Sequence, residues 1–104
     1  MVSCLLECNG RFVLLHRQDN KIHGDKWRQP AGKVDLSDED NLDAMTRELI
    51  EETGLEVKRE ELNFYKTFFV SNPDRDFLYH YFSVHLNEQP VIILSKKNTK
   101  VFLG

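Results

Sequence analysis

Apolar residues near the start of the chain fall into two short runs. The runs cover residues 2–8 and 11–17, and Asn9-Gly10 lies between them. Asn-Gly between two apolar runs is the strongest short-range signal for a β-hairpin, because both residues tolerate a positive φ. We therefore expect two antiparallel strands at the start of the chain.

After residue 41 the apolar residues take a helical period. Leu42, Met45 and Leu49 fall at i, i+3 and i+7, which predicts a helix over about residues 42–53 with one buried stripe. Candidate capping residues are Asn41 or Ser37 at its start and Gly54 at its end.

Two long segments in the second half of the chain are rich in Phe, Tyr and Val. Residues 61–71 and 77–86 have the composition of strands, and residues 72–76 (NPDRD) are typical of a turn, which predicts a second hairpin. The other expected segments are a loop at 18–26, a short strand at 27–29, a loop at 30–41 and short strands at 91–94 and 101–103.

Strands dominate this predicted order, with one strong helix between them. The pattern indicates an α+β domain with a mixed sheet. The 104 residues suit a single domain over positions 1–104, and 40% apolar residues are enough for a packed core.

Charge and composition restrict the partners. The formal net charge is −3, from 14 basic and 17 acidic residues, which disfavours binding of duplex nucleic acid. No apolar run approaches the ~20 residues of a membrane span, and the N-terminus lacks a basic leader, so we expect no membrane partner and a cytoplasmic location. Cys4 and Cys8 are expected to be reduced thiols.

Three carboxylates fall close together on the predicted helix. Glu48, Glu51 and Glu52 stand at i, i+3 and i+4, so they lie on one face about one turn apart. Like charges at this spacing destabilise a helix, and a bound divalent cation would turn their repulsion into attraction. The alternative interpretation is a solvated acidic face, because Glu is a good helix former.

The surrounding residues resemble the Nudix box, G-x5-E-x7-R-E-U-x-E-E-x-G-U, where U is a bulky aliphatic residue. From Glu39 the match is complete, because seven residues later the chain reads RELIEETGL from Arg47 to Leu55. One departure lies upstream, where six residues rather than five separate Gly32 from Glu39.

The resemblance implies an α/β/α sandwich and hydrolysis of a diphosphate linkage with Mg²⁺, or with Mn²⁺ in its place. It makes Glu51 and Glu52 the principal metal ligands, and Glu48 a further ligand or the general base. The backbone carbonyl of Ala31 is an extra ligand by the same resemblance, and Arg47 orients a catalytic glutamate. The implied catalytic residues are thus Glu48, Glu52 and Arg47.

Basic residues near the box are candidates for phosphate contacts. Arg17 and Lys33 are the stronger candidates and Arg28 the weaker, with a solvated surface charge as the alternative for each. Glu39 is expected to bind metal through water or to hold the loop beside the substrate. Candidates for stacking on a base, with a place in the core as the alternative, are Trp27, Phe69 and Tyr81.

Within the family, the resemblance favours a MutT-like pyrophosphohydrolase that converts a nucleoside triphosphate to a monophosphate and pyrophosphate. No signature of the ADP-ribose, NADH or dinucleoside polyphosphate branches follows the box. The alternatives are a hydrolase of a nucleotide sugar or another nucleoside diphosphate conjugate, a non-catalytic nucleotide-binding module, and a structural domain. The expected partner is a small-molecule nucleotide.

Nudix proteins usually carry a further helix on the other sheet face, and no segment for it precedes Gly104. We expect either a truncated C-terminus or a homodimer in which the partner covers that face, because a bare apolar face promotes association.

Overall fold

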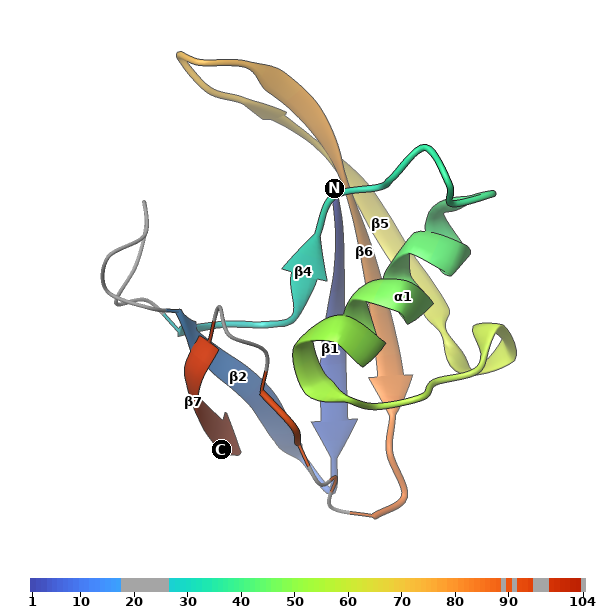
Figure 1. Ribbon diagram of the computed structural model, residues 1–104, viewed down its shortest axis with the longest axis vertical. Coiled ribbons are helices and arrows are strands. Elements are labelled where there is room, and N and C mark those ends of the chain that lie inside the picture. The colour runs from blue at the N-terminus through green and yellow to red at the C-terminus, as the bar shows by residue number, and fades with distance from the viewer. Residues whose placement is uncertain (18–26, 89, 91, 95–97, 104) are drawn as a thin grey trace.

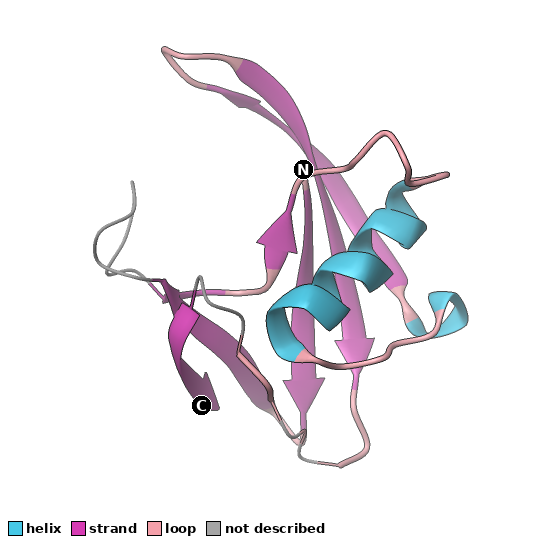
Figure 2. Cartoon of the chain, in the orientation of Figure 1, coloured by secondary structure: helices cyan, strands magenta, loops and turns pink. Residues whose placement is uncertain are grey.

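The computed structural model describes residues 1–17, 27–88, 90, 92–94 and 98–103, so the loop predicted at 18–26 lies outside the described residues. Helix α1 (Asn41–Thr53) is followed by a short 3₁₀ helix, η1 (Arg59–Glu61). The strands are β1 (Val2–Cys8), β2 (Arg11–Arg17), β3 (Trp27–Arg28), β4 (Ala31–Gly32), β5 (Asn63–Ser71), β6 (Asp76–His85) and β7 (Asn98–Leu103). Figure 2 shows the helices and strands by colour.

The N-terminal hairpin forms as predicted. β1 and β2 pair antiparallel, with Cys8 opposite Arg11 across a two-residue turn. The turn residues Asn9 and Gly10 have φ values of 52° and 78°. Positive φ at both positions is the requirement of a type I′ turn, which explains why Asn-Gly is found there.

β1 lies at the centre of a mixed sheet with the strand order β3-β2-β1-β6-β5. It pairs in parallel with β6, and β6 pairs antiparallel with β5 in the second predicted hairpin. β4 also pairs with β1, and β7 pairs with β2. A parallel pair needs a long connection, and the segment between β1 and β6 contains α1 (Figure 1). The predicted α+β class with a mixed sheet is confirmed.

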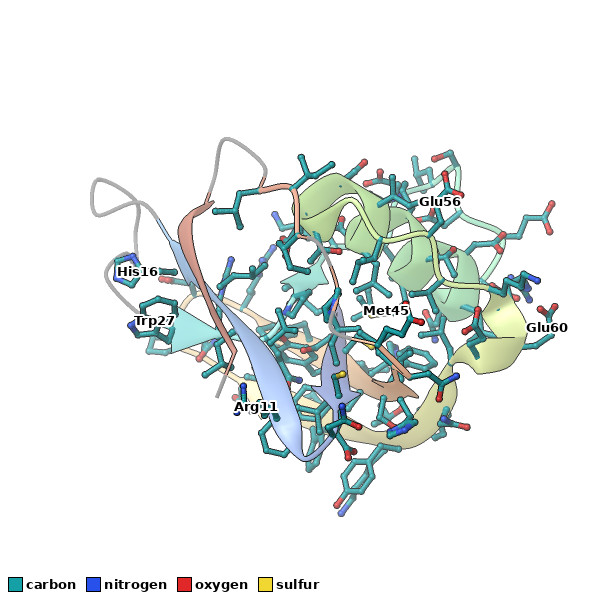
Figure 3. The ribbon with its side chains drawn as sticks, turned by 90° about the horizontal axis from the view of Figure 1, so that it is seen from below. Arg11, His16, Trp27, Met45, Glu56 and Glu60 are labelled. Carbon is teal, nitrogen blue, oxygen red and sulfur yellow. The ribbon has the colours of Figure 1, made fainter. Side chains whose placement is uncertain are left out.

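α1 covers one face of this sheet through its predicted apolar stripe. Met45 and Leu49 are fully buried in one core cluster with Val2, Cys4 and Leu6 of β1. Figure 3 shows Met45 between the helix and the sheet. Truncating a buried leucine or methionine to alanine costs about 2–5 kcal/mol, so this contact anchors the helix firmly. Within the described residues α1 is the one α-helix, and the second helix that the resemblance implies is not among them.

The caps of α1 differ in part from expectation. The N-cap is Asp40, rather than Asn41 or Ser37, because its backbone is extended and its Oδ1 accepts the Asp43 N–H at 2.9 Å. Gly54 is the predicted left-handed C-cap, with φ 74°, and its N–H donates to the Ile50 carbonyl at 2.9 Å.

Four strand predictions need correction. The last strand, β7, begins at Asn98 rather than at 101, because its pairing with β2 starts at Asn98 opposite Arg17. β5 begins at Asn63 rather than at 61, because η1 occupies the preceding residues. The predicted loop at 30–41 contains β4, which is too short to show any period in the sequence. The described residues 92–94 form no strand, because the Ile93 N–H donates instead to the Thr53 carbonyl at 2.8 Å.

The N-terminal cysteines match expectation, because both are free and buried. No helix in the described part of the chain is long and apolar enough to cross a membrane.

Candidate functional site

A cavity of about 680 Å³ lies near the start of β1, where α1, β4 and the outer end of the β5–β6 hairpin meet. Figure 1 shows these elements around the N-terminus. The volume is in the usual range for a small-molecule site. The lining residues are Met1, Arg28, Ala31, Gly32, Lys33, Asp35, Glu48, Glu52, Asn72, Asp74, Arg75, Phe77 and Tyr79.

Glu48 reaches this cavity from α1 and is only 9% exposed. Its carboxylate lies directly over Gly32 of β4, because a Cβ added at Gly32 would stand 2.0 Å from the Glu48 Cδ. Glycine at position 32 is therefore needed for the close approach of the carboxylate. β4 is held in place by its pairing with β1, in which Gly32 lies opposite Val2.

Glu52 lies one turn further along α1 and lines the same cavity, with 7% of the residue exposed. Its Oε2 accepts the Ala31 backbone N–H at 3.2 Å. Burying a carboxylate is costly unless hydrogen bonds or charges compensate it, so two buried carboxylates beside one cavity indicate a functional role.

Arg47 connects the helix to the loop after β4. Its Nε and one terminal nitrogen donate to the two oxygens of Asp38, at 3.0 Å each. Its other terminal nitrogen donates to Glu48 at 2.9 Å and to Glu51 at 3.1 Å. The Arg47 guanidinium lowers the pKa of Asp38, whose side chain is 6% exposed, and hydrogen bonding to Asp38 raises the pKa of Arg47. Arg47 is therefore fixed on both sides, and it fixes Glu48.

The other predicted site residues are more scattered. Glu51 has a 56% exposed side chain paired with Arg47, and it does not line the cavity. Glu39 is exposed outside the lining, and its backbone N–H donates to Asp43 at 3.4 Å. Lys33 lines the cavity, while the side chain of Arg17 lies outside the described part of the structure.

The donor set fits a hard divalent cation that keeps some of its waters. Glu48 and Glu52 supply carboxylate oxygens, and β4 brings Ala31 to the same wall. Among the described residues, no three His, Cys, Asp or Glu side chains are placed to hold a metal ion by themselves. Mg²⁺ commonly binds through one or two carboxylates plus substrate phosphates, so such a site is completed by its substrate.

Sequence reasoning missed the residues that the β5–β6 hairpin contributes to the cavity. Asn72, Asp74, Arg75, Phe77 and Tyr79 come from the hairpin end, which no motif marks. The expected stacking candidates lie elsewhere, since the cavity lining does not include Trp27, Phe69 or Tyr81. Figure 3 shows Trp27 beside His16, and their ring centroids are 4.9 Å apart.

Comparison with known proteins gives a consistent result. A family model described as NUDIX domain matches residues 1–100. The m7GpppN-mRNA hydrolase NUDT17 of Danio rerio is 40% identical over 63 residues, which are 59% of this chain and 21% of that protein. The chain thus spans about a fifth of the length of this curated relative.

Solved structures share the fold at low identity. A MutT/nudix family protein from Enterococcus faecalis superposes with a TM-score of 0.86 at 22% identity, over 98% of this chain and 41% of that one. The MutT protein from Methanosarcina mazei gives 0.79 at 23% identity, over 97% of this chain and 72% of that one. The NUDIX domain of Shewanella oneidensis NrtR, solved with ADP ribose, gives 0.81 at 17% identity, over 98% and 69%.

Proposed function

Since the chain belongs to the Nudix hydrolase family, we propose that it hydrolyses a diphosphate linkage in a small nucleotide with Mg²⁺ as its metal. The observation that carries the proposal is the convergence of Glu48 and Glu52 on one cavity. Both are buried carboxylates, and the cationic side chains of Arg28 and Lys33 line the same space. A cavity with both kinds of charge suits a metal-bound polyphosphate.

Each residue of the site has a role in this proposal. Glu48 and Glu52 would hold the metal, with the Ala31 carbonyl as an additional ligand, and Glu48 would also be the base for the proton of the attacking water. When bound, Mg²⁺ neutralises charge on the phosphate oxygens. Arg47 orients Glu48 through the 2.9 Å hydrogen bond. Glu51 accepts a hydrogen bond from Arg47 at 3.1 Å and so helps to hold the guanidinium. For Glu51 to bind the metal as well, its side chain would have to move from this position.

The contacts to substrate come from the basic residues. We propose that Lys33 and Arg28 bind phosphate oxygens, because both line the cavity that contains the carboxylates. Arg17 is proposed as a further phosphate contact and Glu39 as a residue that supports the loop, both on the strength of the sequence pattern.

The leading substrate is a nucleoside triphosphate, cleaved to a monophosphate and pyrophosphate. A nucleotide sugar or another nucleoside diphosphate conjugate is the alternative, and the 40% identity to NUDT17 of Danio rerio adds a capped 5′ end of RNA as a further alternative. A non-catalytic nucleotide-binding module is the remaining candidate. Two desolvated carboxylates argue for catalysis, because a pure binder of anions gains nothing from them.

A substrate panel tests the proposal. Nucleoside triphosphates, nucleotide sugars, dinucleotides and capped RNA would be incubated with Mg²⁺ or Mn²⁺ and scored for phosphate, pyrophosphate and nucleotide products. Release of products from none of them by the wild-type protein would contradict a hydrolase. Size-exclusion chromatography of the same sample tests the proposed homodimer, and cell fractionation tests the proposed cytoplasmic location.

Substitution of the two carboxylates assigns the activity to this cavity. Glu48→Gln is expected to lower kcat by about 10²–10⁴-fold, the typical contribution of a positioned acid–base group. Glu52→Gln is expected to lower kcat strongly as well, because it removes a charged ligand of the metal. Glu56→Gln is a matched control, because Glu56 is exposed and lies outside the cavity lining. Circular dichroism would verify the fold of each variant. A near-wild-type rate for either Glu48→Gln or Glu52→Gln would remove that residue from the mechanism.

A further inference from the structure

The outer end of the β5–β6 hairpin is a part of the cavity that the carboxylate site does not use. Figure 1 shows the hairpin projecting past the start of β1. The turn at its end is closed by the Asn72 N–H, which donates to the Arg75 carbonyl at 3.1 Å. This places Arg75 and Phe77 on the cavity wall, together with Asn72, Asp74 and Tyr79.

Aromatic residues hold Phe77 in position. Phe77, Tyr79 and Tyr81 alternate along β6, so they share one face of the strand. Their ring centroids are 6.0 Å apart for the first pair and 4.8 Å for the second, and Phe68 packs against Tyr81 at 4.9 Å. The row runs from the sheet into the cavity, and it ends in the Phe77 ring.

Arg75 completes this end of the cavity. Its guanidinium carbon lies 5.8 Å from the centroid of the Phe77 ring. The Arg75 side chain is exposed, and no carboxylate of the described residues forms an ion pair with it. A guanidinium plane beside an aromatic ring is a common surface for stacking of a planar group.

From this arrangement we propose that Arg75 and Phe77 form a subsite for the base of the nucleotide substrate. The inference rests on the proposed function, because it assigns the phosphates to the carboxylate end of the cavity. Arginine and aromatic side chains stack on bases without requiring one particular base. Asn72 and Asp74, on the same wall, carry the amide and carboxylate groups that hydrogen-bond to base edges.

Equilibrium binding separates this subsite from the phosphate site. Two ligands would be compared with Mg²⁺ present: a non-hydrolysable α,β-methylene nucleoside triphosphate and inorganic tripolyphosphate, which has no base. Wild-type protein is expected to bind the nucleotide at least about tenfold more tightly, as expected for one stacked base. Arg75→Gln and Phe77→Leu are each expected to abolish most of this preference without weakening the binding of tripolyphosphate.

Lys66→Gln is the matched control. Lys66 lies over Phe68 on the same hairpin, with its Nζ 5.2 Å from the ring centroid, but neither residue lines the cavity. This variant should keep the wild-type preference. Because Arg75 is exposed, Arg75→Gln should fold normally even if Phe77→Leu does not, and thermal melting verifies both.

Two results would overturn the subsite. One is equal affinity of the wild-type protein for the two ligands, and the other is an equal loss of both ligands in Arg75→Gln, which would make Arg75 a phosphate contact. Failure of the proposed function would give a different result. A wild-type protein that prefers the nucleotide but hydrolyses no substrate would support the subsite and contradict the hydrolase.

Discussion

Gly32 shows how one missing side chain shapes the candidate site. The Glu48 carboxylate occupies the space in which any Cβ at position 32 would stand, with 2.0 Å to its Cδ. The atoms in conflict belong to the flexible end of a side chain, so the carboxylate rather than the backbone would move. The absence of a side chain at position 32 therefore matters more for the position of the Glu48 carboxylate than for the stability of the fold.

Gly32→Ala is expected to reduce kcat/KM by ~10²-fold, because displacement of a positioned group by about 1 Å can have an effect of that size. The melting temperature should change much less than it would for a core truncation. Steady-state kinetics with the best substrate of the panel, together with thermal melting, test both statements. A variant with wild-type kinetics would show that Glu48 does not need this position.

Asp38 anchors Arg47 to the loop through two hydrogen bonds of 3.0 Å, and the Lys33 carbonyl accepts a third at 2.8 Å. Glu39, the acid at the expected place in the box, is exposed and makes no such contact in the described structure. The acid of this loop that accepts hydrogen bonds from Arg47 is therefore Asp38 rather than Glu39. Five residues separate Gly32 from Asp38, which is the spacing of the family pattern.

We predict that Asp38→Asn lowers kcat by about tenfold or more with little change in KM, because Arg47 loses the charge that fixes it beside Glu48. Glu39→Gln, one position away, should behave like the wild-type protein. Steady-state rates of the two variants, measured over a range of Mg²⁺ concentrations, would test the difference. Equal effects of the two substitutions would contradict a special role for Asp38.

At the scale of elements, a second arginine ties the start of α1 to η1. Arg59 donates to both oxygens of Asp40, at 2.9 and 2.8 Å, and it also contacts Asp43. The Arg59 hydrogen bonds lower the pKa of Asp40 from 3.8 to about 2. Because the pKa is lower in the folded state, ionised Asp40 stabilises the fold above about pH 4, and this stabilisation is lost as the pH falls toward 2.

Asp40→Asn isolates this charge, because asparagine is also a good N-cap and keeps an acceptor for the Asp43 N–H. We predict that the wild-type protein is more stable than the variant at pH 7 and that the difference disappears between about pH 4 and pH 2. Urea unfolding at a series of pH values measures it. A difference that stays constant over this range would show that the Arg59 contact does not depend on the charge.

The elements also show what local sequence can predict. Both hairpins and α1 follow from apolar periods and turn residues, which act within a few positions of the chain. β4 and the path of residues 92–94 were missed, because they depend on backbone hydrogen bonds to β1 and to the end of α1. Such bonds leave no period in the sequence.

At the scale of the whole molecule, the two cysteines report on the core. Both thiols are free and buried on β1, and burial raises the pKa of Cys4 to about 12. The thiolate is the reactive form, so a rise from 9.0 to about 12 lowers its fraction near neutral pH by about a thousandfold. The reactivity of Cys4 therefore measures opening of the contact between α1 and the sheet.

We predict that the native protein reacts slowly with a disulfide reagent such as DTNB at pH 8 and that both thiols react rapidly in denaturant. Leu49→Ala, which creates a cavity beneath α1, should accelerate the native reaction because it destabilises the same core. The absorbance of the thiolate that the reagent releases measures the rates of these reactions. Fast reaction of both thiols in the folded wild-type protein would contradict this packing.

The sequence alone determined the class of the fold, the extent of α1 and the acidic cluster with its resemblance to the Nudix box, because these depend on residues close together in the chain. The sequence could not determine which of the acidic side chains lie together at one site in the folded protein. Only the tertiary structure placed Glu48 and Glu52 in the cavity and Glu51 outside it. Only the pairing of β6 with β1 brought Arg75 and Phe77 to the same space, since that depends on contacts between distant segments.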